Sequence, residues 1–81
     1  MNLNETVEMM NSDDYRERFK AESLQLRIRI QGLEKMLEGY KYNTLTFKPS
    51  CSYQLLNAQL NSMKSYASIL EERARIEHIT L

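Results

Sequence analysis

Two tyrosines and several basic residues are spaced so that helices would gather them, and these residue types suit a phosphate-bearing ligand. Arg16, Lys20 and Arg27 stand four and seven residues apart, which places them along one side of a helix. Tyr66 and Arg73 are seven residues apart and would share a side of a second helix. Arginine can hold a phosphate through two parallel hydrogen bonds, and a tyrosine ring offers a flat surface for stacking a base. The predicted ligand-binding residues are Tyr15, Arg16, Lys20, Arg27, Tyr66 and Arg73.

The same residues also fit an ordinary solvated face from which charged side chains and tyrosines reach into water. Free amides at the start of the first helix would attract an anion, but Asp13 and Asp14 offset much of that attraction. Symmetry favours the binding interpretation. In a closed oligomer, one arginine per chain becomes a ring of arginines that converge on an axis.

Residues for catalysis or metal binding are sparse. His78 is the single histidine and Cys51 the single cysteine, so an internal disulfide is impossible and a Cys–His pair has no sequence support. Glu71, Glu72 and Glu77 lie near His78, but scattered carboxylates at a helix end are typical of a solvated face. We therefore expect no enzyme activity, no metal and no cofactor.

The overall charge is balanced, with 11 basic and 11 acidic residues. Binding to a nucleic-acid polymer depends on neutralising many phosphates, so we expect no such partner. Residues 1–10 lack a basic start and an apolar run, and the sequence nowhere has about 20 apolar residues in succession. We expect an intracellular protein that is not bound to a membrane.

Heptad spacing predicts two long helices, at about residues 13–39 and 52–78. Ser12, Asp13 and Asp14 are start signals for the first helix, and Gly39 marks its stop. Pro49 delays the second helix, which Ser50, Cys51 or Ser52 could cap. The apolar stripe of the first helix consists of Phe19, Leu26, Ile30, Leu33, Leu37 and Tyr40. The stripe of the second consists of Tyr53, Leu56, Leu60, Met63, Ala67, Leu70 and Ala74.

A connector of about ten residues, 41–50, would let the second helix return antiparallel to the first. Within it, Leu45 and Phe47 are expected to pack inward. The predicted fold is therefore all-α, an antiparallel two-helix hairpin. Residues 12–81 form this one domain. Residues 1–11 are predicted to be a flexible or loosely docked arm, in which Leu3, Val7 and Met10 allow a short docking helix.

Apolar residues also lie off these stripes, and a two-helix hairpin would leave them in water. A chain of 81 residues buries a small core and often gains stability from a partner subunit. We therefore expect assembly into a homo-oligomeric helical bundle. The predicted interface residues are Leu24, Ile28, Leu55, Ile69 and Ile76. Gly32 would permit a close crossing by a neighbouring helix, or it is simply tolerated at that position.

Three stretches resemble a family of small phage-encoded helical-hairpin proteins over about Asp13 to Ile79. They are DYRERFKAE…L…I…LEKMLEGY, the spaced Leu45, Phe47, Pro49 and Cys51, and LLNAQLNSMKSYASILEERARIE. In size and layout these hairpins are similar to the phage anti-CBASS cyclic-oligonucleotide sponges, which are oligomers that sequester immune messengers without cleaving them. The resemblance implies a tyrosine of the type of Tyr15 at the ligand, and a basic residue that could be Arg27 or Arg29.

The resemblance implies a counter-defence protein in the cytoplasm of an infected bacterial cell. It would sequester a small anionic nucleotide signal, such as a cyclic oligonucleotide, at subunit interfaces. The alternative is a helical protein–protein interaction module that binds a host or virion protein through the same apolar stripes. That alternative requires no small ligand.

Overall fold

The computed structural model describes residues 2–81, and these residues form helices and connecting loops with no strand. A short 3₁₀ helix, η1 (Leu3–Thr6), leads into the single-turn helix α1 (Val7–Met10). Two long helices follow, α2 (Tyr15–Lys41) and α3 (Tyr53–Glu77). The predicted all-helical class is confirmed.

Side-chain caps explain where the two long helices begin. The carboxylate of Asp14 accepts the Arg16 N–H at 2.9 Å, so α2 begins one residue later, at Tyr15. The Ser12 hydroxyl accepts the N–H of Asp14 at 3.1 Å and holds the preceding turn. The Ser52 hydroxyl accepts the Leu55 N–H at 3.1 Å, which selects Ser52 among the three capping candidates.

Gly39 does not stop the first helix, because α2 continues to Lys41. The chain turns instead at Asn43, which adopts a left-handed φ of 58°. A Cβ placed on Gly39 would lie 2.7 Å from Cδ2 of Leu45. The glycine thus allows the close approach of the Leu45 side chain, and its role at this position is one of packing.

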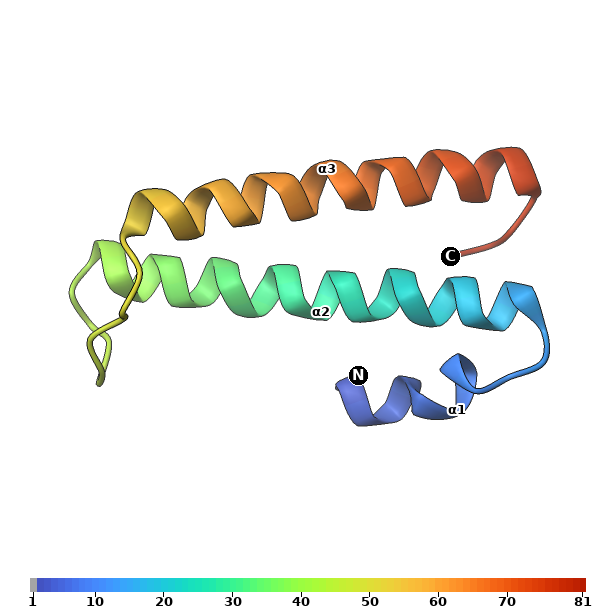
Figure 1. Cartoon of the computed structure of the whole chain (residues 1–81), viewed down its shortest axis with the longest axis horizontal. Coiled ribbons are helices and arrows are strands. Elements are labelled where there is room, and N and C mark those ends of the chain that lie inside the picture. Colours follow the sequence, from blue (N-terminus) through green and yellow to red (C-terminus); the bar gives the residue numbers. More distant parts are fainter. Residues whose placement is uncertain (1) are drawn as a thin grey trace.

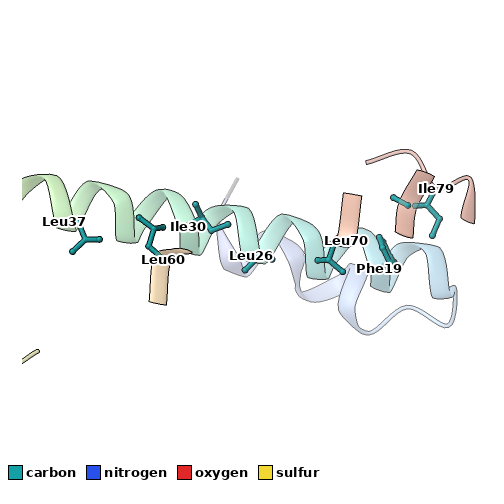
Figure 2. Close-up of a cluster of buried hydrophobic side chains, with 8 residues drawn as sticks. Phe19, Leu26, Ile30, Leu37, Leu60, Leu70 and Ile79 are labelled. Carbon is teal, nitrogen blue, oxygen red and sulfur yellow. The ribbon is translucent and has the colours of Figure 1, made fainter. Parts of the chain in front are cut away.

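Helices α2 and α3 lie side by side and run in opposite directions, and α1 lies along the other side of α2 (Figure 1). The three helices form a single layer, with Cα extents of 43 × 25 × 16 Å. The core lies between α2 and α3 and follows the predicted stripes, as Figure 2 shows for the buried members. These are Phe19, Leu26, Ile30, Leu37, Leu60, Leu70 and Ala74, and Ile79 joins them from outside the stripes.

The N-terminal segment contacts α2 through a polar group that it buries. Thr6 is fully buried, and its hydroxyl donates to the carbonyl of Leu3 at 2.7 Å and accepts from Nε2 of Gln25 at 2.9 Å. The same amide nitrogen contacts the sulfur of Met10. Residues 3–10 of the predicted arm are therefore helical and in contact with the domain, while residue 1 lies outside the described residues.

The chain reverses after α3 at His78, which adopts a left-handed φ of 57°. The N–H of Ile79 donates to the carbonyl of Ala74 at 2.8 Å, which is the closing bond of a left-handed helix cap. Ile79 is thereby buried against the core near Phe19 (Figure 2). The heptad stripes did not include this residue.

The connector between α2 and α3 follows the prediction only in part. Leu45 is half-buried over Gly39, but Phe47 is 55% exposed, so the expectation that both side chains pack inward is wrong for Phe47. None of the helices among residues 2–81 is long and apolar enough to span a membrane.

Candidate functional site

Tyr15 and Arg73, both predicted to bind ligand, meet across α2 and α3. Nη2 of Arg73 donates to the hydroxyl of Tyr15 at 2.8 Å, and that hydroxyl donates to Oε1 of Glu77 at 3.0 Å. Nε of Arg73 lies 3.5 Å from Oε2 of the same carboxylate. The guanidinium is therefore fixed by two partners on one edge.

The ring of Phe19 packs against both Arg73 and Tyr15. The guanidinium carbon of Arg73 lies 5.0 Å from the centroid of the Phe19 ring, a cation–π distance. The Tyr15 ring meets the Phe19 ring edge-on, with centroids 6.1 Å apart. Phe19 is buried, whereas the side chain of Arg73 is 47% exposed. The result is a rigid, solvent-accessible cation beside an accessible tyrosine, and we call Tyr15, Phe19, Arg73 and Glu77 the arginine cluster.

Tyr66 lies on the same side of the layer. Its hydroxyl donates to Oε1 of Glu22, which stands seven residues after Tyr15 on α2. The Tyr66 ring remains 44% exposed. Tyr66 and Arg73 thus share one broad face of the molecule with Tyr15, and we call this face the tyrosine face.

The other three predicted residues are not part of this arrangement. A helix turns about 100° per residue, so Lys20, five residues after Tyr15, projects about 140° away from it around α2. Lys20 and Arg27 line a small pocket of about 80 Å³ with Met9, Leu24 and Leu81. Arg16 is exposed, and the structure places it beside neither Tyr66 nor Arg73. The six predicted residues therefore divide between two sides of the molecule.

Several members of the site were not predicted. Glu22, Phe19 and Glu77 hold or neutralise the predicted residues, and each is one helical turn or one heptad from one of them. Spacing along each helix could have indicated these neighbours. The pairing of Tyr15 with Arg73 could not be found this way, because it depends on how α2 and α3 are rotated against each other.

Glu77 supplies the negative charge that lies beside Arg73 in this site. Its carboxylate partly neutralises Arg73, but Nη1 of Arg73 has no protein partner among residues 2–81. On another side of α3, a hydrogen bond from Arg75 lowers the pKa of Glu72, and the same bond raises the pKa of Arg75. Glu72 is fully exposed, so this pair is a surface ion pair outside the arginine cluster.

The predicted interface residues differ in exposure between the two helices. Leu55, Ile69 and Ile76 on α3 are each about 60% exposed. Leu24 and Ile28 on α2 are half-buried, and Leu24 shares a pocket with Met9 of α1. The unpartnered apolar surface thus lies mainly on α3, because the N-terminal segment lies against α2 beside Leu24.

A pocket lies away from the arginine cluster, at the connector. It has a volume of about 490 Å³ and is lined by residues of the α2 end and the loop, including Gly39, Leu45 and Phe47. Cys51 is an exposed free thiol at the same end of the molecule. Residues 2–81 contain no group of three His, Cys, Asp or Glu side chains that could hold a metal ion.

Comparison with known proteins identifies relatives of this chain. A family model described as Sequestin matches residues 13–76, which include α2 and nearly all of α3. A protein of Enterobacteria phage T4, described as an uncharacterised 7.5 kDa protein in the denB–rIIB intergenic region, is 42% identical over 59 residues. That match covers 73% of this chain and 88% of the T4 protein. No solved structure matches the chain.

Proposed function

Because this chain belongs to the Sequestin family and has a small phage relative, we propose that it is a phage counter-defence protein that sequesters a nucleotide immune signal. The family name suggests sequestration, and the match spans nearly all of both long helices that carry the arginine cluster. The ligand is a small anionic nucleotide, such as a cyclic oligonucleotide, and it is released unchanged. The protein acts in the cytoplasm of the infected bacterial cell.

The observation that carries this proposal is the fixed guanidinium of Arg73 beside Tyr15. Nη2 and Nε are held by Tyr15 and Glu77, while Nη1 lies free on an exposed side. An arginine that is already oriented loses little side-chain freedom when it binds a phosphate. Tyr66, on the same face, adds an exposed ring on which a base can stack.

The binding site lies between copies of the chain in this proposal. The arginine cluster is shallow and open on one chain, and the apolar residues beside it on α3 are exposed. Assembly covers those residues and encloses the arginine cluster between chains. A protein with no net charge thereby keeps a local cationic site at an interface.

The test is calorimetric titration of the protein, above about 10 μM, with a panel of cyclic di- and trinucleotides. We expect saturable heat with at least one member. Heat denaturation of the complex followed by chromatography should then return that nucleotide intact. No heat with any member, or recovery of a cleaved product, would overturn the proposal.

A second function is favoured by the exposed apolar residues Leu55, Ile69 and Ile76. In this alternative, α3 docks onto a helix of a host or virion protein and no nucleotide is bound. The two functions differ in the mass of the isolated protein. A monomer that changes state only with a partner supports docking, whereas a stable homo-oligomer supports sequestration.

A further inference from the structure

Each long helix carries a series of four residues spaced seven apart, outside the core stripe. The series on α2 consists of Tyr15, Glu22, Arg29 and Met36. The series on α3 consists of Leu55, Ser62, Ile69 and Ile76. Residues at this spacing form a continuous seam along a helix, as in coiled coils. The first and last residues of each seam are 21 positions apart, or about 32 Å along the helix.

Both seams lie on the tyrosine face. The α2 seam contains Tyr15 and Glu22, whose partners on α3 are Arg73 and Tyr66. Arg73 and Tyr66 each precede a member of the α3 seam by three residues, so they lie directly beside it. The tyrosine face therefore carries two parallel rows of heptad residues.

Each seam can pair with the same seam of a second copy that runs in the opposite direction. When two copies of α3 run antiparallel about the midpoint of the seam, Leu55 meets Ile76 of the other copy and Ser62 meets Ile69. In two copies of α2 arranged the same way, Glu22 meets Arg29 and Tyr15 meets Met36. These pairs are apolar with apolar, small with large, and acid with base. In a twofold interface each of these residue pairs occurs twice, once in each direction.

The two midpoints lie at the same level of the molecule. The midpoint of the α2 seam falls between Gln25 and Leu26, and that of the α3 seam between Ser65 and Tyr66. Tyr66 contacts Glu22, and the Tyr40 ring packs on the Tyr53 ring with centroids 5.7 Å apart. Because the helices are antiparallel, one residue forward on α3 corresponds to one residue back on α2. Counted from the Tyr66–Glu22 contact, the α3 midpoint lies beside residues 22–23 of α2, and counted from the Tyr40–Tyr53 contact it lies beside residues 27–28. One twofold axis can therefore serve both seams.

The charges on this face permit such an interface. The α3 seam carries no charge, and the charged residues beside it, Glu72 and Arg73, have partners within the chain in Arg75 and Glu77. Arg29 on α2 is exposed and makes no ion pair among residues 2–81. Glu22 of a second copy supplies the missing partner. The interface thus leaves no uncompensated charge along either seam.

We propose that a second copy of this chain packs on the tyrosine face, antiparallel, about a twofold axis at the level of Leu26 and Ser65. This inference deepens the proposed function and rests on it for the role of the site. The second copy brings its Met36 against Tyr15 and its Arg29 against Glu22. It also places its Tyr66 beside Tyr66 at the axis. The arginine cluster is therefore completed by residues of the other copy.

Cysteine cross-linking tests the register directly. In a Cys51→Ser background, we expect Ser62→Cys and Ile69→Cys to form no disulfide dimer when each is oxidised alone. Mixed and allowed to exchange, the two variants should form one. Ser68→Cys, one residue from Ile69 and turned about 100° away, is the matched control and should not cross-link with Ser62→Cys. A disulfide dimer of each single variant alone would show that the two copies run parallel. No disulfide in the mixture would show that a second copy does not pack on the tyrosine face in this register. Either result would overturn the proposal.

Charge reversal gives a second measurement that does not depend on cysteine. Glu22→Arg and Arg29→Glu should each weaken the dimer at least fivefold in sedimentation, and the double variant should recover most of that loss. A double variant as weak as the single ones would overturn the pairing of these residues. Neither experiment uses a nucleotide. Cross-linking in the predicted register without calorimetric heat would therefore reject the nucleotide ligand and retain the interface.

Discussion

Tyr15 and Arg73 stand 58 residues apart in the chain, and a hydrogen bond of 2.8 Å joins the hydroxyl of one to the guanidinium of the other. The Phe19 ring packs against both, and Glu77 accepts a hydrogen bond from Tyr15 and forms an ion pair with Arg73. This contact ties the start of α2 to the end of α3. It also sets the position of the cation to which we assign ligand binding.

Arg73→Ala should weaken nucleotide binding while leaving the assembly intact. A hydrogen bond to a charged group contributes about 1.5–3 kcal/mol, so we expect Kd to rise roughly ten- to a hundredfold. Calorimetry measures the change, and sedimentation checks the mass. Arg75→Ala is the matched control, because Arg75 pairs with Glu72 outside the arginine cluster. A normal Kd for Arg73→Ala would remove this residue from the site.

Glu77→Gln should strengthen binding of an anion. The carboxylate of Glu77 lies 3.5 Å from Nε of Arg73 and repels a phosphate that approaches the same guanidinium. Charge interactions at exposed sites are worth up to about 1 kcal/mol, so we expect Kd to fall by up to about fivefold. The gain should shrink at high salt because the repulsion is screened.

Glu72→Gln serves as the control for that substitution, since it removes the same charge from α3 without touching Arg73. An equal gain in both variants would point to net charge as the cause. Weaker binding in Glu77→Gln would show that the carboxylate orients the guanidinium more than it opposes the ligand.

Ile69→Asp should dissociate the assembly and leave the helices folded. Ile69 is 59% exposed, so the substitution costs little in one chain, but it places a carboxylate in the centre of the proposed seam. Sedimentation should show a monomer, and circular dichroism should show unchanged helix content. Ser68→Asp is the control, and it should keep the mass of the unaltered protein. An Ile69→Asp protein that keeps its mass would place the interface elsewhere.

The two glycines of α2 should respond differently to alanine. A Cβ on Gly32 would meet no atom within 4 Å, whereas one on Gly39 would meet Leu45 at 2.7 Å. Alanine is favoured over glycine inside a helix by about 1 kcal/mol, so Gly32→Ala should raise Tm by about 4–8 °C. Gly39→Ala should gain less, because Leu45 must move.

Sedimentation of Gly32→Ala distinguishes the two explanations for this glycine. If a neighbouring helix crosses there closely, the added methyl group should weaken the assembly. Our proposed interface runs along other residues of α2, so we expect the mass to be unchanged.

His78→Gly should stabilise the fold. A left-handed φ of 57° is strained for a residue with a side chain and unstrained for glycine. We expect a gain of about 0.5–1 kcal/mol, measured as a higher midpoint of thermal unfolding. His78→Val should lower the midpoint, since a β-branched residue is poorly tolerated at positive φ. Equal midpoints for the two variants would show that the turn does not hold Ile79 in place.

The two long helices were predictable because their information is local. Heptad spacing gave the residues of the core stripes, and Asp14 and Ser52 lie among the expected start signals. Gly39 was misleading, since a glycine near a helix end suggests a stop, while the connector uses it for a close contact. His78 gave no signal, because histidine has only a modest preference for the left-handed region.

The site was predictable only within each helix. Spacing placed Tyr66 beside Arg73 and Arg16 near Lys20, but it could not say which sides of α2 and α3 face the same way. The relative rotation of the helices is set by core packing, and it places Arg73 and Tyr66 of α3 beside Tyr15 and Glu22 of α2, away from Lys20 and Arg27. The partial burial of Leu24 could not be predicted from spacing either, because it depends on where the short N-terminal helix docks.

The arrangement of all three helices in one layer, about 16 Å thick between Cα atoms, limits what one chain can enclose. The hydrophobic core is correspondingly thin, since it lies between just the two long helices. Such a thin molecule has no interior large enough to hide a nucleotide, so any shielding of a ligand must come from a neighbouring molecule. Dilution below the concentration at which copies associate would then abolish capture as well, without any change to the fold.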